Sequence, residues 1–506
     1  MDSATEAFAA APQAAASRLP QVTPGKWYGL VLGAVALVAI LALPTPAGLP
    51  VAGQRMLGIL AFAVIVWMTE AVTYAVSAGI IMALMAFLLG TAPNAANPKA
   101  VLGTSRALEG ALSGFSNPAF ALVAAALFLA AAMMQTGLDK RIALLVLSKI
   151  GAKTNRVLAG VILVGFILSF FVPSTTARVS CLVPIVLGII AAFGVDRKSR
   201  FAAVMMIATA QADSIWNVGI KTAAAQNMVA VGFIEKMLGR YITWPEWFIA
   251  AVPFAAVMSV VLYVVLMKMM PPETAEIAGG QEAIAKALAG MGPMKASEKR
   301  LLALSAILLF FWATEKIVHD FDTSTTTIAA ITIMLLPGIG VMTWKEAQGR
   351  ISWATVVLFG VGISLGSVLL STQAAPWLAK NIVAWFGLAN MGALAIVAVL
   401  GAFLIIIHLG FASATALASA MIPIVISIVQ GVKTPGINAI GLTMVLQFVV
   451  SFGFILPVNA PQNMVAYGTD TFEAKDFIRT GIPLTIAAYL LILLFGATYW
   501  KWLGLV

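Results

Sequence analysis

The sequence has little of what a soluble enzyme or a disulfide-rich secreted protein needs. The single cysteine, Cys181, excludes an internal disulfide framework, and the two histidines, His319 and His408, argue against a cysteine- or histidine-rich metal site. No GxxxxGK[ST] phosphate loop is present, so nothing indicates ATP as an energy source. Only 10% of the residues are charged, whereas 61% are hydrophobic, and such a chain cannot build a water-soluble surface. The composition indicates an integral membrane protein.

Apolar runs long enough to cross a bilayer recur along the chain. A spanning helix needs about 20 mainly apolar residues. We expect ordinary crossing helices at nine places: 27–46, 53–70, 73–91, 118–136, 247–270, 299–317, 324–343, 353–373 and 481–503. Residues 201–232 and 439–468 carry polar residues, glycine and proline at membrane depth, which predicts helices broken near the midplane. Two further runs, 157–195 and 391–430, are split by hydroxyl residues and form either two short crossing helices each or a re-entrant hairpin.

The distribution of cations decides between these alternatives. If both split runs are re-entrant and the N-terminus is cytoplasmic, the inner loops carry most of the 30 lysines and arginines, as the positive-inside rule requires. We therefore predict an all-α polytopic fold with about eleven crossings and two re-entrant hairpins. The net charge of +10 is explained by loops that face anionic lipid, so no nucleic-acid partner is expected.

The chain contains an internal duplication. Ala225-Gln-Asn-Met-Val-Ala230 is nearly repeated 236 positions later by Pro461-Gln-Asn-Met-Val-Ala466. Two further matches occur in the same order in both halves: a Trp-x-Thr-Glu motif ending at Glu70 and Glu315, and a Pro-Ile-Val motif at 184–186 and 423–425, in the second part of each split run. The first hairpin is flanked by many cations and the second by few, so the two enter from opposite faces. This arrangement is an inverted repeat, which is typical of secondary transporters.

The polar tips of the two hairpins are the candidate binding site for an anion. The hydroxyls of each tip precede a half-helix whose first N–H groups are unpaired and whose dipole is positive there. The tip residues are Ser174, Thr175 and Thr176 in the first repeat and Ser413, Ala414 and Thr415 in the second. Two such tips near the midplane would hold the two carboxylates of a small molecule. The alternative is that these residues only cap the half-helices.

Two cations fall inside predicted membrane segments, namely Arg178, just after the first tip, and Lys221, just before the first Gln-Asn motif. Intramembrane cations are costly and rarely without a role. Each either attracts an anionic substrate or forms a structural ion pair with Asp213, the nearest intramembrane acid. Asn227 and Asn463, in the two Gln-Asn motifs, could bind the substrate or a cation, or could satisfy the broken backbone.

These motifs resemble the divalent anion/sodium symporter family of di- and tricarboxylate carriers over roughly residues 30–506. The resemblance rests on PSTTAR at 173–178 and FASAT at 411–415, each followed by Pro-Ile-Val, on the two QNMVA loops, and on GFSNPAF at 114–120. It implies a homodimer, an elevator-like movement of the hairpin-bearing parts, and binding roles for the tip residues, Asn227 and Asn463. Together with the composition of the tail and the linker, this predicts a disordered cytoplasmic tail (1–26), scaffold helices (27–156), a transport-domain half (157–270), a cytoplasmic linker (271–298), scaffold helices (299–390) and a second transport-domain half (391–506).

The departures from the family pattern favour one branch. Sodium-coupled members carry Asn at the middle of each tip, where this chain has Thr175 and Ala414, and Arg178 makes the first tip similar to that of dicarboxylate exchangers. We predict a sodium-independent exchanger of succinate, malate, 2-oxoglutarate or citrate type in a bacterial inner membrane. Exchange is expected if an unpaired Arg178 cannot cross the membrane without substrate. The alternative is a sodium-coupled dicarboxylate or sulfate symporter, with Na+ held by loops near Asn227 and Asn463.

Other classes fit the sequence less well. A channel should show polar stripes along whole helices, but the polar residues here gather at mid-membrane breaks. An enzyme should show converging catalytic side chains, and Glu70, Glu315 and Asp213 lie in different spans. We expect Glu70 and Glu315 at helix ends as structural partners. No cofactor is expected other than Na+ as an alternative coupling ion, and the expected partners are small dicarboxylate anions, membrane lipid and a second copy of the chain.

Overall fold

The computed structural model describes residues 27–94, 97–151, 153–192, 194–273, 280–432 and 434–506, so the predicted tail at 1–26 lies outside the described residues. The described chain is almost entirely helical, and its strands, β1 (Pro93–Asn94) and β2 (Asn97–Val101), form one short antiparallel pair. Within the described residues, seven helices are long and apolar enough to cross a membrane. The predicted all-α polytopic membrane fold is confirmed.

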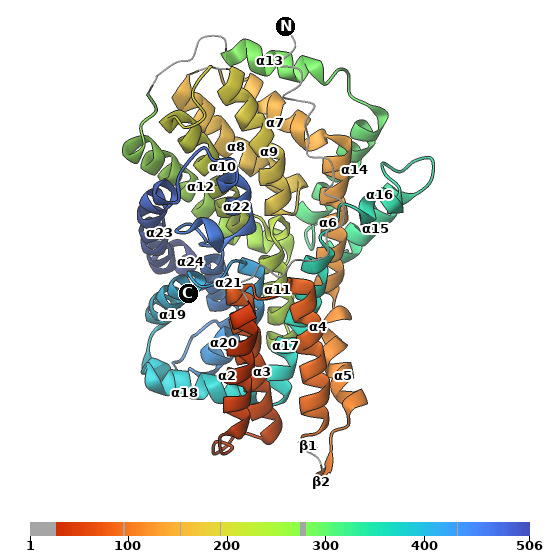
Figure 1. The fold of residues 1–506 in the computed structure, drawn as a ribbon, viewed down its shortest axis with the longest axis vertical. Coiled ribbons are helices and arrows are strands. Elements are labelled where there is room, and N and C mark those ends of the chain that lie inside the picture. The colour runs from red at the N-terminus through yellow and green to blue at the C-terminus, as the bar shows by residue number, and fades with distance from the viewer. Residues whose placement is uncertain (1–26, 95–96, 152, 193, 274–279, 433) are drawn as a thin grey trace.

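The first half of the chain folds into the helices from α2 to α12 (Figure 1). Its elements are α2 (Trp27–Ala42), α3 (Val51–Thr69), α4 (Tyr74–Leu84) continued by the π-helix η1 (Met85–Leu89), α5 (Thr104–Leu112), the 3-10 turn η2 (Ser113–Phe115), α6 (Pro118–Thr136), α7 (Leu138–Ser148), α8 (Thr154–Phe171), α9 (Thr175–Ala192), α10 (Arg200–Gly219), η3 (Lys221–Ala223), α11 (Ala225–Leu238) and α12 (Trp244–Met269).

The linker contains α13 (Gly280–Gly290), which packs on α7 and α9. The second half follows with α14 (Ala296–Ala313), α15 (Thr323–Leu335), α16 (Trp344–Gln348), α17 (Trp353–Ser371), α18 (Ala374–Trp385), η4 (Leu388–Asn390), α19 (Ala393–His408), α20 (Ala414–Gly431), α21 (Ala439–Val450), η5 (Pro457–Asn459), α22 (Pro461–Tyr467), α23 (Ala474–Ala497) and α24 (Tyr499–Trp502).

Both split runs fold as helical hairpins. Helices α8 and α9 meet at Pro173 and Ser174, and helices α19 and α20 meet at residues 409–413. In Figure 1 the first hairpin lies in the upper half of the molecule and the second in the lower half, as expected for an inverted repeat. Both predicted broken helices are also present, as α10–η3–α11 and α21–η5–α22.

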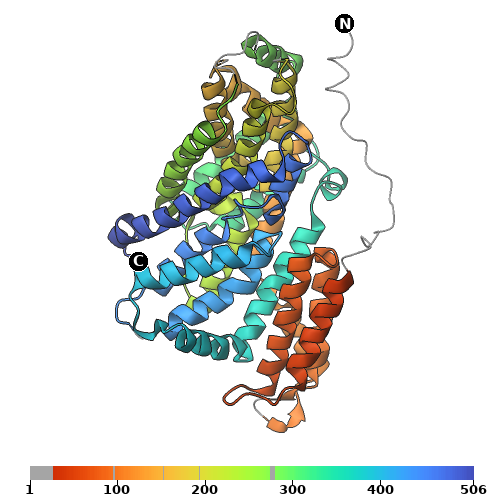
Figure 2. The same ribbon diagram turned by 60° about the vertical axis from the view of Figure 1, so that its left-hand side comes forward.

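The two repeats are interleaved around the hairpins. Helix α22 of the second repeat packs on α9 of the first, while α11 of the first repeat packs on α20 and α21 of the second. Helix α17 runs beside this assembly and contacts both α20 and α11. Figure 2 shows α2, α3 and α4, in red and orange, standing at one side of it. Each tip is therefore surrounded by elements of both repeats.

The duplicated Trp-x-Thr-Glu motif lies at equivalent helix ends. The Trp67 indole donates to Ser77 Oγ at 3.1 Å, and the Trp312 indole donates to Thr327 Oγ1 at the same distance, which ties each helix to the next one. Glu70 caps α3 in a left-handed conformation, with φ 47°, and Glu315 follows the end of α14. The prediction that both acids lie at helix ends is confirmed.

Candidate functional site

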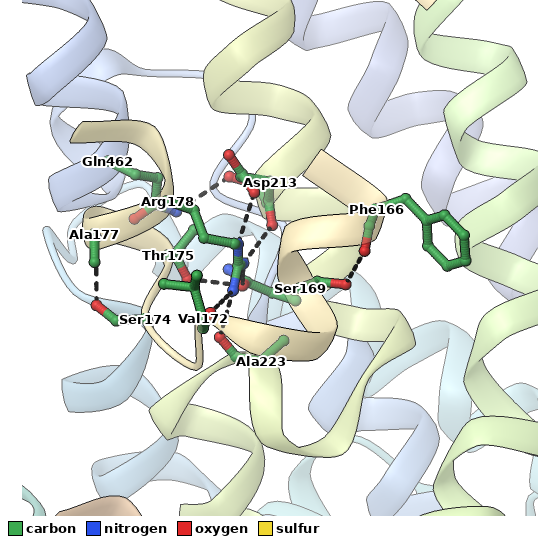
Figure 3. A network of polar contacts seen from close by, with 12 residues as sticks. Phe166, Ser169, Val172, Ser174, Thr175, Ala177, Arg178, Asp213, Ala223 and Gln462 are labelled. Atoms are coloured by element: carbon green, nitrogen blue, oxygen red, sulfur yellow. Dashed lines mark hydrogen bonds and ion pairs between the residues drawn. The ribbon is translucent and has the colours of Figure 1, made fainter. Parts of the chain in front are cut away.

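The two hairpin tips present the start of α9 and the start of α20. Ser174 Oγ accepts a hydrogen bond from the backbone N–H of Ala177 at 3.4 Å, and Ser413 Oγ accepts one from Ala416 at 3.3 Å, so both serines cap their helices. Thr175 is buried and donates to Asn217 Oδ1 at 2.7 Å (Figure 3).

The remaining tip residues differ in exposure. Ser174, Thr176 and Ala414 are partly exposed, whereas Thr415 is buried. Ala414 brings no polar side chain, so the second tip offers an anion only its backbone N–H groups and the hydroxyls on either side. As a cap, each serine hydroxyl accepts a hydrogen bond. It can still donate one to an anion, because a hydroxyl both donates and accepts.

The two Gln-Asn motifs close the helix breaks. Asn227 donates to the carbonyls of Asn217 and Ile220 at 2.6 and 3.1 Å, and Asn463 donates to the carbonyls of Gly453 and Leu456 at 2.8 and 3.5 Å. These bonds satisfy backbone groups that the missing helical turn leaves open. Both asparagines therefore satisfy the broken backbone through their amide N–H groups. Their side-chain oxygens stay available for other partners.

Buried amides link the two repeats reciprocally. Gln226 of the first repeat donates to Ser451 of the second at 3.4 Å, and Gln462 of the second donates to Ser214 of the first at 3.1 Å. A second pair, missed in the sequence, does the same: Gln211 donates to the Phe454 carbonyl at 2.9 Å, and Gln447 contacts Asn227 Oδ1 at 3.5 Å. Residues 211 and 447 share the 236-residue offset of the Gln-Asn motifs, which was the available signal.

Arg178 is a fully buried cation. Its Nε donates to Asp213 Oδ1 at 2.7 Å, and its Nη2 donates to Asn217 Oδ1 at 2.7 Å and to the Asp213 carbonyl at 3.4 Å. Its Nη1 donates to the carbonyls of Val172 and Ala223 at 2.7 and 3.0 Å (Figure 3). These five bonds use all the donors of a guanidinium. The premise that Arg178 is unpaired is therefore wrong, because the fold brings Asp213 on α10 against the start of α9.

The second repeat joins its hairpin to its helix break without a charged side chain. The positions equivalent to Arg178 and Asp213 are Leu417 and Val449. There Asn459 Nδ2 donates to the carbonyls at the end of α19, those of residues 408, 409 and 411, at 2.9 to 3.2 Å. A staple between the hairpin and the helix break is thus common to both repeats, and it is ionic in only one of them.

Lys221 is engaged on another side of the helix break. Its ammonium donates to the Ile242 carbonyl at 2.6 Å, to the Tyr241 hydroxyl at 3.2 Å and to Thr323 Oγ1 at 3.4 Å, and it lies 4.5 Å from the centre of the Tyr241 ring. The buried Glu315 carboxylate accepts from the same Tyr241 and Thr323 hydroxyls and from the Trp244 N–H, at 2.7 to 2.8 Å. Two hydroxyls therefore bridge a buried cation and a buried anion.

The geometry defines a polytopic membrane protein with two inverted hairpins, whose helices α9 and α20 each pack against broken helices of both repeats. The family described as the sodium:sulfate symporter transmembrane region matches residues 25–506, and the chain belongs to this family of transporters. The predicted family resemblance is thereby confirmed.

Individual relatives agree with this assignment. The chain is 58% identical over 94% of its length to a protein named "Membrane protein" from Cupriavidus necator, of which it covers 93%. It is 25% identical over 93% of its length to the sodium-dependent dicarboxylate transporter SdcS of Staphylococcus saprophyticus, covering 90% of that protein. Among solved structures, the Alcanivorax borkumensis YdaH transporter shares the fold, with a TM-score of 0.54, 15% identity, and coverage of 84% of this chain and 97% of that one.

Proposed function

We propose that the protein is a sodium-independent carrier of small dicarboxylates that holds its substrate between the two hairpin tips and moves it by an elevator motion. The observation that carries this proposal is the pairing of two capped half-helices, α9 and α20, each presenting hydroxyls and N–H groups and each packed against a broken helix of the other repeat. One carboxylate at each tip would gain several hydrogen bonds. The SdcS relative, a dicarboxylate transporter, supports this substrate class.

Sodium independence is proposed from the tip side chains. Ala414 cannot ligate a cation through its side chain, and Thr175 offers a single hydroxyl where sodium-coupled members carry Asn. The obligate-exchange mode needs a separate experiment, because its argument assumed an unpaired Arg178 and the cation is neutralised by Asp213. An elevator motion and a homodimer in a bacterial inner membrane remain part of the proposal by family analogy.

The test is uptake of labelled succinate into proteoliposomes, with or without a sodium gradient and with or without unlabelled dicarboxylate inside. We expect uptake that is unchanged by sodium. A requirement for internal dicarboxylate would establish exchange, whereas uptake into vesicles without it would establish net transport. Uptake that occurs only with a sodium gradient would contradict the proposal.

The role of the tips is tested by Thr176→Val, which removes a partly exposed hydroxyl of the first tip at constant volume. Hydrogen bonds to charged groups contribute about 1.5–3 kcal/mol, so we expect the KM for succinate to rise roughly tenfold or more with folding unaffected. Thr443→Val is the matched control, because Thr443 bonds only locally to the Ala439 carbonyl of α21 among the described residues. An unchanged KM in Thr176→Val would place the substrate elsewhere.

A sodium-coupled symporter is the second candidate, and one observation favours it. Within the described chain, the buried oxygens Gln211 Oε1, Gln447 Oε1 and Asn463 Oδ1 have no hydrogen-bond partner. An unsatisfied buried amide oxygen costs about 1–3 kcal/mol, and a cation near the breaks would satisfy it. The same uptake experiment decides between the two candidates, since this one requires the sodium gradient to drive accumulation.

A further inference from the structure

His408 is a buried imidazole at the second hairpin tip. It is the last residue of α19, five positions before Ser413, and only 2% of it is exposed. Its Nε2 lies 3.3 Å from the carbonyl oxygen of Asn459, the residue whose amide staples this tip to the helix break. The ring also lies against Gly453, since a Cβ at that glycine would be 3.4 Å from both Cε1 and Nε2. The imidazole therefore sits where hairpin and broken helix meet.

The equivalent place in the first repeat is occupied by a permanent cation. The offset of 236 residues that relates the two Gln-Asn motifs pairs Ala223 with Asn459. Arg178 Nη1 donates to the Ala223 carbonyl at 3.0 Å, and His408 Nε2 faces the Asn459 carbonyl at 3.3 Å. The same carbonyl position is thus bonded by a guanidinium in one repeat and by an imidazole in the other.

The imidazole can gain a proton without losing this contact. A ring nitrogen that faces a carbonyl oxygen must carry the hydrogen, so Nε2 is the donor and Nδ1 keeps its lone pair in the neutral ring. Nδ1 has no hydrogen-bond partner among the described residues. Protonation adds one hydrogen at Nδ1 and converts the imidazole to an imidazolium, with no other bond made or broken.

Few charged groups surround His408. Helices α20 and α21, which pack against α19, have no titratable side chain. Helix α23 carries Lys475, Asp476 and Arg479 in its first two turns, and its Tyr489 hydroxyl donates to the Ala398 carbonyl. Across the tip, the scaffold residues Glu70 and Tyr74 interact with one another, and Tyr74 lies close to Ser413. A charge on His408 would consequently be compensated best by an anion at the tip.

We propose that His408 binds a proton together with the dicarboxylate, which makes the protein a proton-coupled carrier. This inference rests on the proposed function and names its coupling ion. With Arg178 neutralised by Asp213, the proton on His408 supplies the positive charge that a dianion needs in the membrane. Linkage makes the effect reciprocal: bound substrate favours the imidazolium, and substrate affinity falls as the pH rises.

The first test measures protons taken up when succinate is added to the purified protein in weakly buffered solution containing a pH indicator. We expect wild type to take up about one proton per bound succinate at a pH where the free imidazole is neutral, and His408→Gln to take up none. His319→Gln is the matched control. It removes His319, the histidine of the α14–α15 loop, whose Nε2 contacts the Phe311 carbonyl and Thr314 Oγ1, and should behave as wild type. Because all three proteins receive the same succinate, titration of the substrate itself cancels.

A second measurement does not use His408→Gln and stays valid if that variant does not fold. With ¹⁵N-labelled histidine the chain gives ring-nitrogen signals from two imidazoles, and His319→Gln shows which signals belong to which histidine. We expect saturating succinate to shift the His408 signals to those of the imidazolium and to leave His319 unchanged. A His408 ring that stays neutral with succinate bound would overturn the inference.

Transport provides the outcome that separates this inference from the proposed function. With the membrane potential clamped, an inward proton gradient should accelerate succinate uptake about tenfold in wild type, within the usual range of coupling between two sites, and less than twofold in His408→Gln. Uptake that ignores the proton gradient would overturn the proton coupling and leave dicarboxylate transport standing. Absence of succinate binding and uptake under every condition would reject both.

Discussion

The pair of Arg178 and Asp213 shows how one buried charge can organise a hairpin tip. Each partner has a side-chain exposure of 0%, and the guanidinium also bonds the ends of α8 and η3. Removing one member of a buried pair leaves an uncompensated charge, which costs about 3–5 kcal/mol. The second repeat indicates an apolar solution, since Leu417 and Val449 occupy the equivalent positions.

Copying the second repeat into the first tests this role. We expect Arg178→Leu and Asp213→Val to lower the free energy of unfolding by about 3–5 kcal/mol each. The double variant should lose less than the sum, because it leaves no lone charge. Denaturation of the purified proteins measures the three changes. If the two single losses of stability added up to that of the double variant, Arg178 and Asp213 would not interact directly. If Arg178→Leu were as stable as wild type, the bonds of Arg178 would not stabilise the hairpin.

The sequence alone located Arg178, Lys221 and Asp213 as charges at membrane depth, and an ion pair with Asp213 was among the alternatives. It could not identify the cation that pairs, because the choice depends on how α9 packs against α10. It also could not show that Gln211 and Gln447 reach across to the other repeat. Buried amides carry no charge, so their cost in a membrane is too small to single them out.

Helix α17 presents glycines to elements that we predict to move. A Cβ at Gly362 would overlap the Ser419 hydroxyl of α20 and lie 2.6 Å from its Cβ. A Cβ at Gly366 would overlap the Phe233 ring of α11 and lie 2.5 Å from Pro423 of α20. Gly360, on the same helix, faces Phe115 of η2 instead, which belongs to the predicted scaffold. One helix therefore meets both predicted bodies through glycine.

We expect Gly362→Ala to slow transport at least severalfold, since overpacking costs about 1–3 kcal/mol and would resist sliding of α20 along α17. Adding Ser419→Gly should restore the rate, because it removes the overlapping side chain. Gly360→Ala, which overpacks a contact within the predicted scaffold, should lower the thermal stability and leave the transport rate and the substrate affinity nearly unchanged. A Gly362→Ala variant with a normal uptake rate would show that α20 does not slide on this face.

Helix positions were predictable where hydrophobic runs ended at clear signals. The expected spans at 118–136 and 353–373 correspond to α6 and α17 within two residues. The span expected at 324–343 was too long, because α15 ends at Leu335, ahead of Pro337 and Gly338. Helix α23 begins at Ala474 rather than 481, since Glu473 and Asp476 form a capping box that extends the helix into polar residues.

The cluster of Lys221, Tyr241, Glu315 and Thr323 crosses the boundary between the two predicted bodies of the molecule. Lys221 and Tyr241 belong to the predicted transport-domain half, and Glu315 and Thr323 to the predicted scaffold. Both charged groups are 1% exposed. If the bodies move relative to each other, these bonds must break and re-form in every cycle, at a cost of several kcal/mol for each charge left unpaired.

This requirement predicts that a covalent bridge across the cluster stops transport. The Tyr241 hydroxyl lies 3.2 Å from the Thr323 backbone nitrogen, so cysteines at positions 241 and 323 should be joined by a short thiol-reactive cross-linker in a Cys181→Ser background. We expect cross-linking to reduce succinate uptake at least tenfold and a cleavable linker to restore it. Bridging Thr314→Cys and His319→Cys, which contact each other at 3.1 Å within the predicted scaffold, should leave uptake unchanged. Full activity of the protein bridged between 241 and 323 would mean that the α11–α12 loop and the α14–α15 loop travel together, and the moving boundary would then have to lie at α17 instead.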